Sequence, residues 1–310
     1  MCLAALLWGI PVPVGAVEVV VSIKPLHALV AAVMEGEGAP RLLIQGHVSE
    51  HTYALRPSDA RLLSKAELIF WGGVGLEGFL VRPLENLAPK AVKVALLEAS
   101  GVSRLPVRAG GAWEEEGHDH GHDHDHDHGG KSEHGEAHGP TDPHAWLDPR
   151  NAMAMGKAIA GALAAVDPAH GARYQANATG LTQRLEALDR QLERDLAPVR
   201  QRPYIVFHDA YQYFEHRYAL GTVGSIMVHP ERPPGARRVQ EIAKRIAETR
   251  AVCLFTEPQY SPRLAETVAA SHPVRIGVLD PLGAAMKEGP ELYFELMQGL
   301  SGALIQCLNT

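Results

Sequence analysis

The chain has 310 residues and a formal net charge of −7, and 46% of its residues are hydrophobic. This length suits two ordinary domains, and the hydrophobic content is enough for a buried core in each. The acidic balance and the lack of a basic stripe argue against a nucleic-acid partner. The unusual feature is a total of 17 histidines, which points to metal or proton chemistry.

Residues 1–16 are predicted to be a secretory signal peptide. The segment is largely apolar and ends in small residues that suit cleavage before Val17. It lacks the usual basic residue at its start, and a buried first strand or a short membrane anchor are the alternatives. An anchor is disfavoured because the apolar run is short and contains Pro11 and Pro13. The mature protein is therefore expected to be soluble in the periplasm.

Short β-rich runs alternate with helical patterns along both halves of the chain. Strands are expected at residues 17–24, 42–45, 68–71, 92–97, 204–207, 222–228, 252–256 and 275–279. Helices are expected, among others, at residues 57–66, 151–166, 235–249, 262–271 and 291–307. This alternation predicts an α/β fold of two lobes, each a parallel sheet covered by helices. The first lobe would cover residues 17–170 and the second residues 199–310.

A segment almost free of apolar residues, 114–140, interrupts the first lobe. Without a core to bury, it is expected to be a disordered surface loop. Its imidazoles alternate with carboxylates, and such a chain can bind divalent transition metals in shifting arrangements. A neutral spacer is the alternative. The histidines are His118, His120, His122, His124, His126, His128, His134 and His138.

Between the two lobes, residues 171–198 are expected to form one amphipathic helix. Its leucines recur three or four positions apart, and Pro198 ends the pattern. A helix of about 26 residues is about 40 Å long, at 1.5 Å per residue. This length would let it span both lobes and join them rigidly. The alternative is an ordinary helix that covers one lobe.

Three cysteines are present, and Cys2 lies within the predicted signal peptide. An even pair, Cys253 and Cys307, remains. In an oxidising compartment such a pair predicts a disulfide, with two buried free thiols as the alternative.

Three of the other histidines have unusual settings. His51 lies between an expected strand and an expected helix, His144 follows the His-rich segment, and His208 ends an expected strand. Asp280 also follows a strand directly. Ligands bind at the carboxyl ends of strands in open α/β sheets. We therefore expect His208 and Asp280 to face one cleft from the second lobe, with His51 and His144 facing it from the first.

At these positions the chain resembles the metal-binding proteins that serve ABC importers, and among them the zinc, ZnuA-type, branch. The resemblance covers about residues 19–309. Its motifs are specific together, although each is weak alone. They are Ser49-Glu-His51 with Leu55-Arg-Pro-Ser-Asp59, His144-Ala-Trp-Leu147, Val206-Phe-His-Asp-Ala-Tyr211, Phe255-Thr-Glu-Pro-Gln259 and Leu279-Asp-Pro-Leu-Gly283.

The resemblance implies two α/β lobes joined by a rigid helix, with one transported Zn²⁺ in the cleft between them. It implies His51, His144 and His208 as ligands, with Glu50 or water in a fourth place. Asp280 matches a position that binds metal in manganese-binding relatives. The implied partner is a zinc ABC permease in the inner membrane, and the protein would be a non-enzymatic monomer. The His-rich segment and the cysteine pair also resemble this branch.

Coordination chemistry agrees with this assignment. Zn²⁺ accepts neutral imidazoles in tetrahedral sites, whereas Mn²⁺ prefers oxygen ligands. A carboxylate from Glu50 or Asp280 would offset half of the ion's charge in a buried site. Equally, Glu50 could be solvated, and Asp280 could hold a loop by hydrogen bonds. Asp209 is a candidate for orienting His208. Glu257 could be a hinge residue or a group that orients a ligand, and neither role is chosen.

Three other functions were weighed. A His₃ zinc hydrolase could activate water at an open fourth position, but the His-Glu-x-x-His motif of many zinc proteases is missing. A manganese or iron importer subunit is disfavoured by His208, since those relatives usually have a carboxylate there. An adhesin or a metal buffer without a permease would share the same site, and the sequence does not separate it from an importer subunit.

Overall fold

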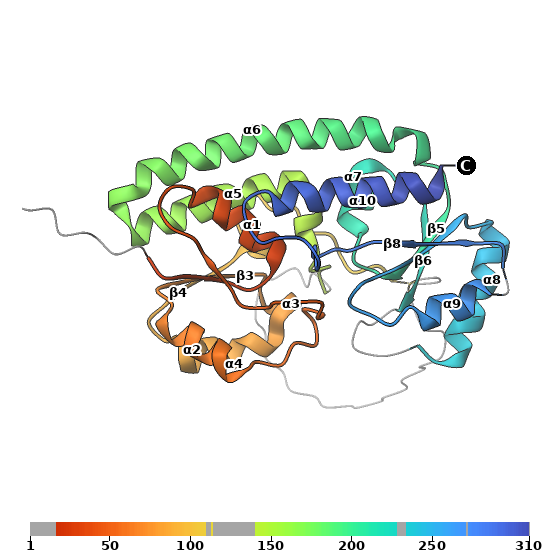
Figure 1. Cartoon of the computed structure of the whole chain (residues 1–310), viewed down its shortest axis with the longest axis horizontal. Helices are drawn as coiled ribbons and strands as arrows, with labels where there is room; N and C mark the ends of the chain where they lie inside the picture. The colour runs from red at the N-terminus through yellow and green to blue at the C-terminus, as the bar shows by residue number, and fades with distance from the viewer. Residues whose placement is uncertain (1–16, 110–112, 114–139, 228–233, 271, 310) are drawn as a thin grey trace, which may run out of the picture.

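The computed structural model describes residues 17–109, 113, 140–227, 234–270 and 272–309. The predicted signal peptide and the eight histidines of the His-rich segment lie outside the described residues. Two parallel sheets lie side by side, and one long helix runs across both of them (Figure 1). The predicted two-lobed α/β fold is therefore confirmed.

The first lobe contains a parallel sheet with the strand order β2-β1-β3-β4. The central strand β3 carries only apolar side chains and all of them are buried, as expected for a strand covered on both faces. Expected strand 17–24 is shorter in the structure, because Lys24 and Pro25 already begin a helix. The strands are β1 (Val19–Val21), β2 (Arg41–Leu42), β3 (Leu68–Trp71) and β4 (Val92–Ala95).

The second lobe repeats this arrangement with the order β6-β5-β7-β8, again all parallel. From β5 the chain continues to β6 on one side, and β7 then lies on the other side of β5. The carboxyl end of β5 is therefore at the switch point of the sheet, where α/β sheets bind ligands. His208 is its last residue. The strands are β5 (Tyr204–His208), β6 (Thr222–Met227), β7 (Cys253–Thr256) and β8 (Arg275–Val278).

Helices cover both sheets. Proline occupies the first position of α2 and α5. The first N–H groups of a helix have no partner within the helix, so the N–H that proline lacks is not missed there. The helices are α1 (Lys24–Val33), α2 (Pro57–Lys65), α3 (Val74–Glu77), α4 (Val81–Leu87), α5 (Pro149–Val166), α6 (Gly171–Leu196), α7 (Gln212–Tyr218), α8 (Ala236–Thr249), α9 (Arg263–Ala269) and α10 (Leu292–Leu308). Short 3₁₀ turns are Gly78–Leu80, Leu96–Glu98, Ala145–Leu147, Pro168–His170 and Ala197–Val199.

The long helix α6 joins the two lobes. It has 26 residues, and its buried positions recur every three or four residues from Tyr174 to Leu196. It packs against α1 and α5 of the first lobe and against α10 of the second. This contact pattern confirms a joining helix and excludes a helix that covers one lobe alone.

One hydrophobic core continues beneath α6 from the first lobe into the second. It contains β1 and β3 of the first sheet, Val206 and Phe255 of the second, and much of α10. A smaller, separate core lies on the other face of the second sheet, against α8 and α9. Because the larger core is shared, the lobes are fixed to one another along the α6 side of the molecule.

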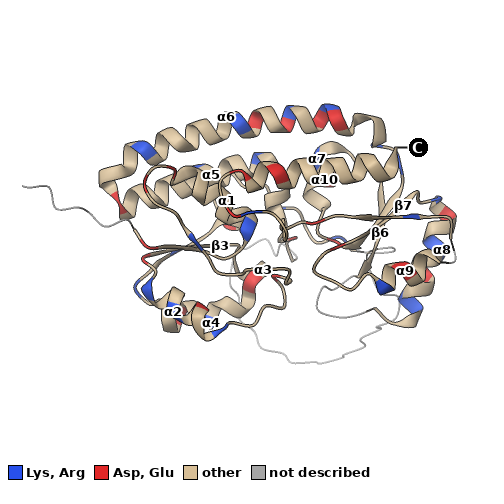
Figure 2. Ribbon diagram, viewed as in Figure 1, with Lys and Arg blue, Asp and Glu red and all other residues tan. Residues whose placement is uncertain are grey.

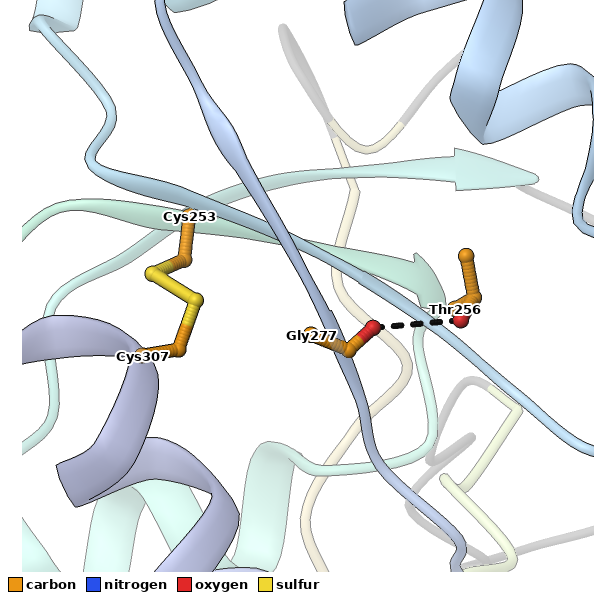
Figure 3. Close-up of a disulfide and its surroundings, with 4 residues drawn as sticks. All are labelled: Cys253, Thr256, Gly277 and Cys307. Atoms are coloured by element: carbon orange, nitrogen blue, oxygen red, sulfur yellow. Dashed lines mark hydrogen bonds between the residues drawn. A yellow bond between two sulfur atoms is a disulfide. The ribbon is translucent and has the colours of Figure 1, made fainter.

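The predicted disulfide between Cys253 and Cys307 is present and ties α10 to β7 (Figure 3). Gly277 of the neighbouring strand lies beside it. A Cβ at Gly277 would come within 2.5 Å of the Phe255 ring and 3.4 Å of the Cys307 sulfur, so glycine permits this close packing.

Charged residues of both signs occur along α6 and on α8 and α9 (Figure 2). Among the described residues, no helix combines the length and the apolar character needed to cross a membrane.

Candidate metal centre

Four side chains converge between the lobes: Glu50, His51, His144 and His208. One potential ligand atom from each lies within 4.8 Å of the others. Glu50 and His51 come from the loop between β2 and α2, His144 directly precedes the 3₁₀ turn Ala145–Leu147, and His208 ends β5. The structure thus brings together the three histidines and one of the two carboxylates expected from the sequence.

Distances within the cluster suit a small cation. The Nε2 atoms of His51 and His144 are 3.2 Å apart. Two nitrogens bound to one tetrahedral zinc at about 2.0–2.1 Å lie about 3.4 Å from each other. The Oε1 atom of Glu50 lies 3.6 Å from His51 Nε2 and 3.9 Å from His144 Nε2. Three nitrogens and one oxygen can therefore surround one ion with small adjustments.

Asp142 orients His144. Its Oδ1 accepts hydrogen bonds from His144 Nδ1, at 2.8 Å, and from the His144 backbone N–H, at 2.9 Å. A carboxylate only accepts, so Nδ1 carries the ring proton and Nε2 presents its lone pair to the cluster. Carboxylate partners of this kind fix the ring of a metal-binding histidine and raise its basicity.

Glu257 does the same for His208. Both of its oxygens lie within hydrogen-bond distance of His208 Nδ1, at 2.8 and 2.7 Å. The Nε2 atom of His208 is buried and has no hydrogen-bond partner among the described residues, and the same is true of Glu50 Oε1. Unpaired buried polar atoms cost free energy, so these two atoms are available as ligands for a cation.

Burial and charge set the protonation of the cluster. Burial, helped by the neighbouring imidazoles, holds the pKa values of His51 and His144 well below their usual range. For His208, burial lowers the pKa, but the charge and hydrogen bond of Glu257 outweigh it and raise the pKa to about 8. Burial also raises the pKa of Glu50 to about 7. Two of the three imidazoles are thus neutral and ready to bind metal at neutral pH.

Asp280, the other candidate carboxylate, lies outside this cluster in the described structure. Its Oδ1 accepts from the backbone N–H groups of Leu282 and Gly283, and its Oδ2 accepts from that of Ala284, at 2.6 Å. Gln259 also donates to Oδ1. This is the loop-holding role that the sequence left open for Asp280.

Asp209 does not orient His208, contrary to the hypothesis drawn from their adjacency. Its carboxylate pairs with Arg108, which also binds Glu215. The residues that orient the ligands are Asp142 and Glu257. The sequence left this role open for Glu257 and did not point to Asp142. Glu257 directly follows β7, so the same rule of strand ends that found His208 could have found it.

Comparison with known proteins identifies this architecture. The family model described as zinc-uptake complex component A, periplasmic, matches residues 19–307. The chain belongs to this family. The resemblance to ZnuA-type proteins is therefore confirmed. Members of the family are components of a transport complex and not enzymes, which sets aside the hydrolase alternative.

Individual relatives agree. The high-affinity zinc uptake system protein ZnuA of Brucella suis is 46% identical over 307 residues, covering 94% of this chain and 91% of that protein. The Yersinia pestis protein of the same name is 35% identical and covers 100% of this chain and 96% of its own. A crystal structure of ZnuA superposes with a TM-score of 0.78 at 24% identity, over 95% of this chain and all of that one.

Proposed function

We propose that this chain captures one Zn²⁺ between its lobes in the periplasm and delivers it, as a monomer, to an ABC permease in the inner membrane. Family membership supports zinc uptake as the process. The observation that carries zinc capture is the convergence of three imidazoles and one carboxylate within 4.8 Å. Residues 1–16 would direct export, which would also supply the oxidising compartment that the disulfide needs.

The donor set supports zinc over manganese. Zinc is borderline-soft and accepts imidazole readily, whereas manganese sites are richer in oxygen. In this cluster three nitrogens, on His51, His144 and His208, accompany a single oxygen of Glu50. The carboxylate of Asp280 is engaged by backbone N–H groups and is not among the four side chains that converge.

Metal capture is tested by competition against a chelator of known affinity. Wild-type protein should bind one zinc tightly, and His144→Ala should weaken that binding by at least about a hundredfold because a ligand is lost from a closed site. His216→Ala is the matched control, since His216 is exposed on α7 and remote from the cluster, and it should bind zinc as wild type does. Equal affinity of His144→Ala and wild type would refute the site.

Delivery is tested by uptake of radioactive zinc into cells that carry the permease but lack this chain. Supplying wild-type protein should restore uptake at low zinc, and His144→Ala should not. If wild-type protein binds zinc tightly yet never restores uptake, the buffer alternative holds and delivery is wrong.

A further inference from the structure

Two different sets of contacts join the segments that follow β7 and β8 to the first lobe. The loop 280–286, which follows β8, is held by the first lobe. The ammonium of Lys24 donates to the carbonyl oxygens of Gly283, Ala284 and Met286, at 3.2, 2.6 and 3.1 Å. The indole N–H of Trp146 donates to Pro281 O at 3.0 Å.

This loop is difficult to move. Lys24 is only 8% exposed, so withdrawing its carbonyl partners would leave a buried cation unsolvated. From within the second lobe, Asp280 accepts three backbone N–H groups of the same loop. Displacing the loop would therefore break hydrogen bonds on both of its faces, and several of them involve charged groups.

The neighbouring turn 257–260, which follows β7, meets the first lobe through one side chain. Tyr260 donates from its hydroxyl to the Ser49 hydroxyl at 3.4 Å, which is longer than an ordinary hydroxyl hydrogen bond. Among the described residues this is the turn's single hydrogen bond to the first lobe. Ser49 directly precedes Glu50 and His51 of the metal centre.

The same turn also controls His208. The backbone N–H of Tyr260 donates to Glu257 O, so the two residues move as one turn. The Tyr260 ring stacks on the Phe207 ring, with the ring centroids 4.9 Å apart. The Tyr260 and His208 rings meet edge to face, with centroids 5.8 Å apart. Moving the turn would open the cross-lobe hydroxyl contact and the hydrogen bond from Gln259 Nε2 to Asp280 Oδ1 of the fixed loop. It would also withdraw the Glu257 carboxylate that orients His208.

We propose that the turn 257–260 is the element that moves when zinc enters and leaves, and that the Tyr260–Ser49 hydrogen bond is its latch. The proposal rests on the zinc-capture function above. Tyr260 is a positioning residue in this scheme: it touches no metal but holds the turn closed over His208. The loop 280–286 and the shared core beneath α6 stay fixed during exchange.

The latch is tested by the rate at which zinc-loaded protein releases metal to excess chelator. Tyr260→Phe should release zinc about two- to tenfold faster, the range that one ordinary hydrogen bond allows. Ser49→Ala should be at least as fast, because it also removes the hydrogen bond from the His51 backbone N–H to Ser49 Oγ. The double variant should be no faster than Ser49→Ala, because Ser49→Ala already removes the bond that Tyr260→Phe removes. The matched control is Tyr174→Phe. The Tyr174 hydroxyl, near the start of α6, donates to Asp167 at the end of α5, so its removal should leave the rate unchanged.

Hydrogen exchange locates the movement. Removing zinc from wild-type protein should raise amide exchange in peptides that cover the turn 257–260 and leave those covering the loop 280–286 unchanged. Release from Tyr260→Phe at the wild-type rate, additive effects in the double variant, or an equal rise in the loop would each overturn the proposal. If wild-type protein binds no zinc at all, the capture function itself has failed, which is a distinct result.

Discussion

His208 and Glu257 form a buried pair in which Nδ1 of the imidazole donates to the carboxylate, 2.7 Å from Oε2. The pair decides which nitrogen of His208 is free for metal. Glu257→Gln keeps an oxygen acceptor but removes the charge, so it should lower zinc affinity about ten- to a hundredfold, as for other partners of metal-binding histidines. Chelator competition measures this loss.

A control for that variant is Asp209→Asn. Asp209 adjoins His208 in the sequence, but its carboxylate binds Arg108. We expect a much smaller change in zinc affinity than for Glu257→Gln. Circular dichroism should show that both variants are folded. A larger effect at Asp209 than at Glu257 would contradict the assignment of Glu257.

Zinc affinity should rise with pH from about pH 6 to about pH 9 and level off above that range. The free protein binds protons at His208, whose pKa is about 8, and at Glu50, whose pKa is about 7. Zinc must displace these protons, so acidification favours the metal-free form. His51 and His144 add nothing in this window because their pKa values are lowered.

Calorimetry in two buffers of different ionisation enthalpy counts the protons released per zinc. Near pH 6 the count should approach two, and above about pH 9 it should approach zero. Glu257→Gln should move the upper part of this window to lower pH, since the raised pKa of His208 depends on the charge of Glu257. A proton count that is zero at every pH would contradict the prediction.

The two candidate carboxylates should behave in opposite ways. Glu50→Gln should reduce zinc affinity by at least about tenfold, because a buried dication loses its compensating charge. Asp280→Asn should change zinc affinity by less than about threefold. It should instead lower the free energy of unfolding by about 1–3 kcal/mol, because the amide cannot accept from Ala284 as Oδ2 does. Chelator competition and urea unfolding separate the two effects.

The disulfide should stabilise the fold without affecting metal binding. Its two cysteines lie 54 positions apart, and the chain-entropy model then assigns it about 4 kcal/mol as an upper figure. Replacing both Cys253 and Cys307 by serine should lower the free energy of unfolding by up to that amount. Zinc affinity should be unchanged, because the bridge is at the start of β7 and Glu257 follows its end. Labelling of native protein should find no free thiol at either position.

The His-rich segment should be dispensable for the tight site. Its flanks pair with each other, since Val107 N donates to Pro140 O and Asp142 N donates to Leu105 O. Replacing residues 114–139 by a short glycine-serine linker should therefore leave Asp142 and His144 in place. Calorimetry should show one tight zinc retained and weaker binding lost. Loss of the tight zinc would show that the segment supplies a ligand.

Periodicity and strand ends predicted much of this structure because they depend on local patterns. The leucine spacing of α6 and the apolar runs of both sheets are visible in the sequence, and the carboxyl end of β5 placed His208. The hydrogen-bond partners of Asp280 could not be predicted from the sequence. Its carboxylate is taken by N–H groups of the loop that follows it, and only the turn of that loop brings them within reach.

Contacts between the lobes also could not be predicted from the sequence. Lys24 looks like an ordinary surface lysine at a helix start, and nothing near it in the chain indicates that carbonyls of the loop 280–286 surround its ammonium. The Tyr260–Ser49 bond joins residues 211 positions apart. Such pairs follow from how the lobes are set against each other, which local patterns do not encode.

The bond from Lys24 to Ala284 spans 260 positions and affects how the chain folds. The first helix, α1, packs against the last, α10, and the ammonium of Lys24 finds its partners only in the loop that leads into α10. During synthesis, the first lobe therefore cannot complete its native contacts until the loop 280–286 and α10 have been made. Contacts of such long range slow folding. A chain truncated before α10 is expected to be unstable in both lobes and not in the second alone.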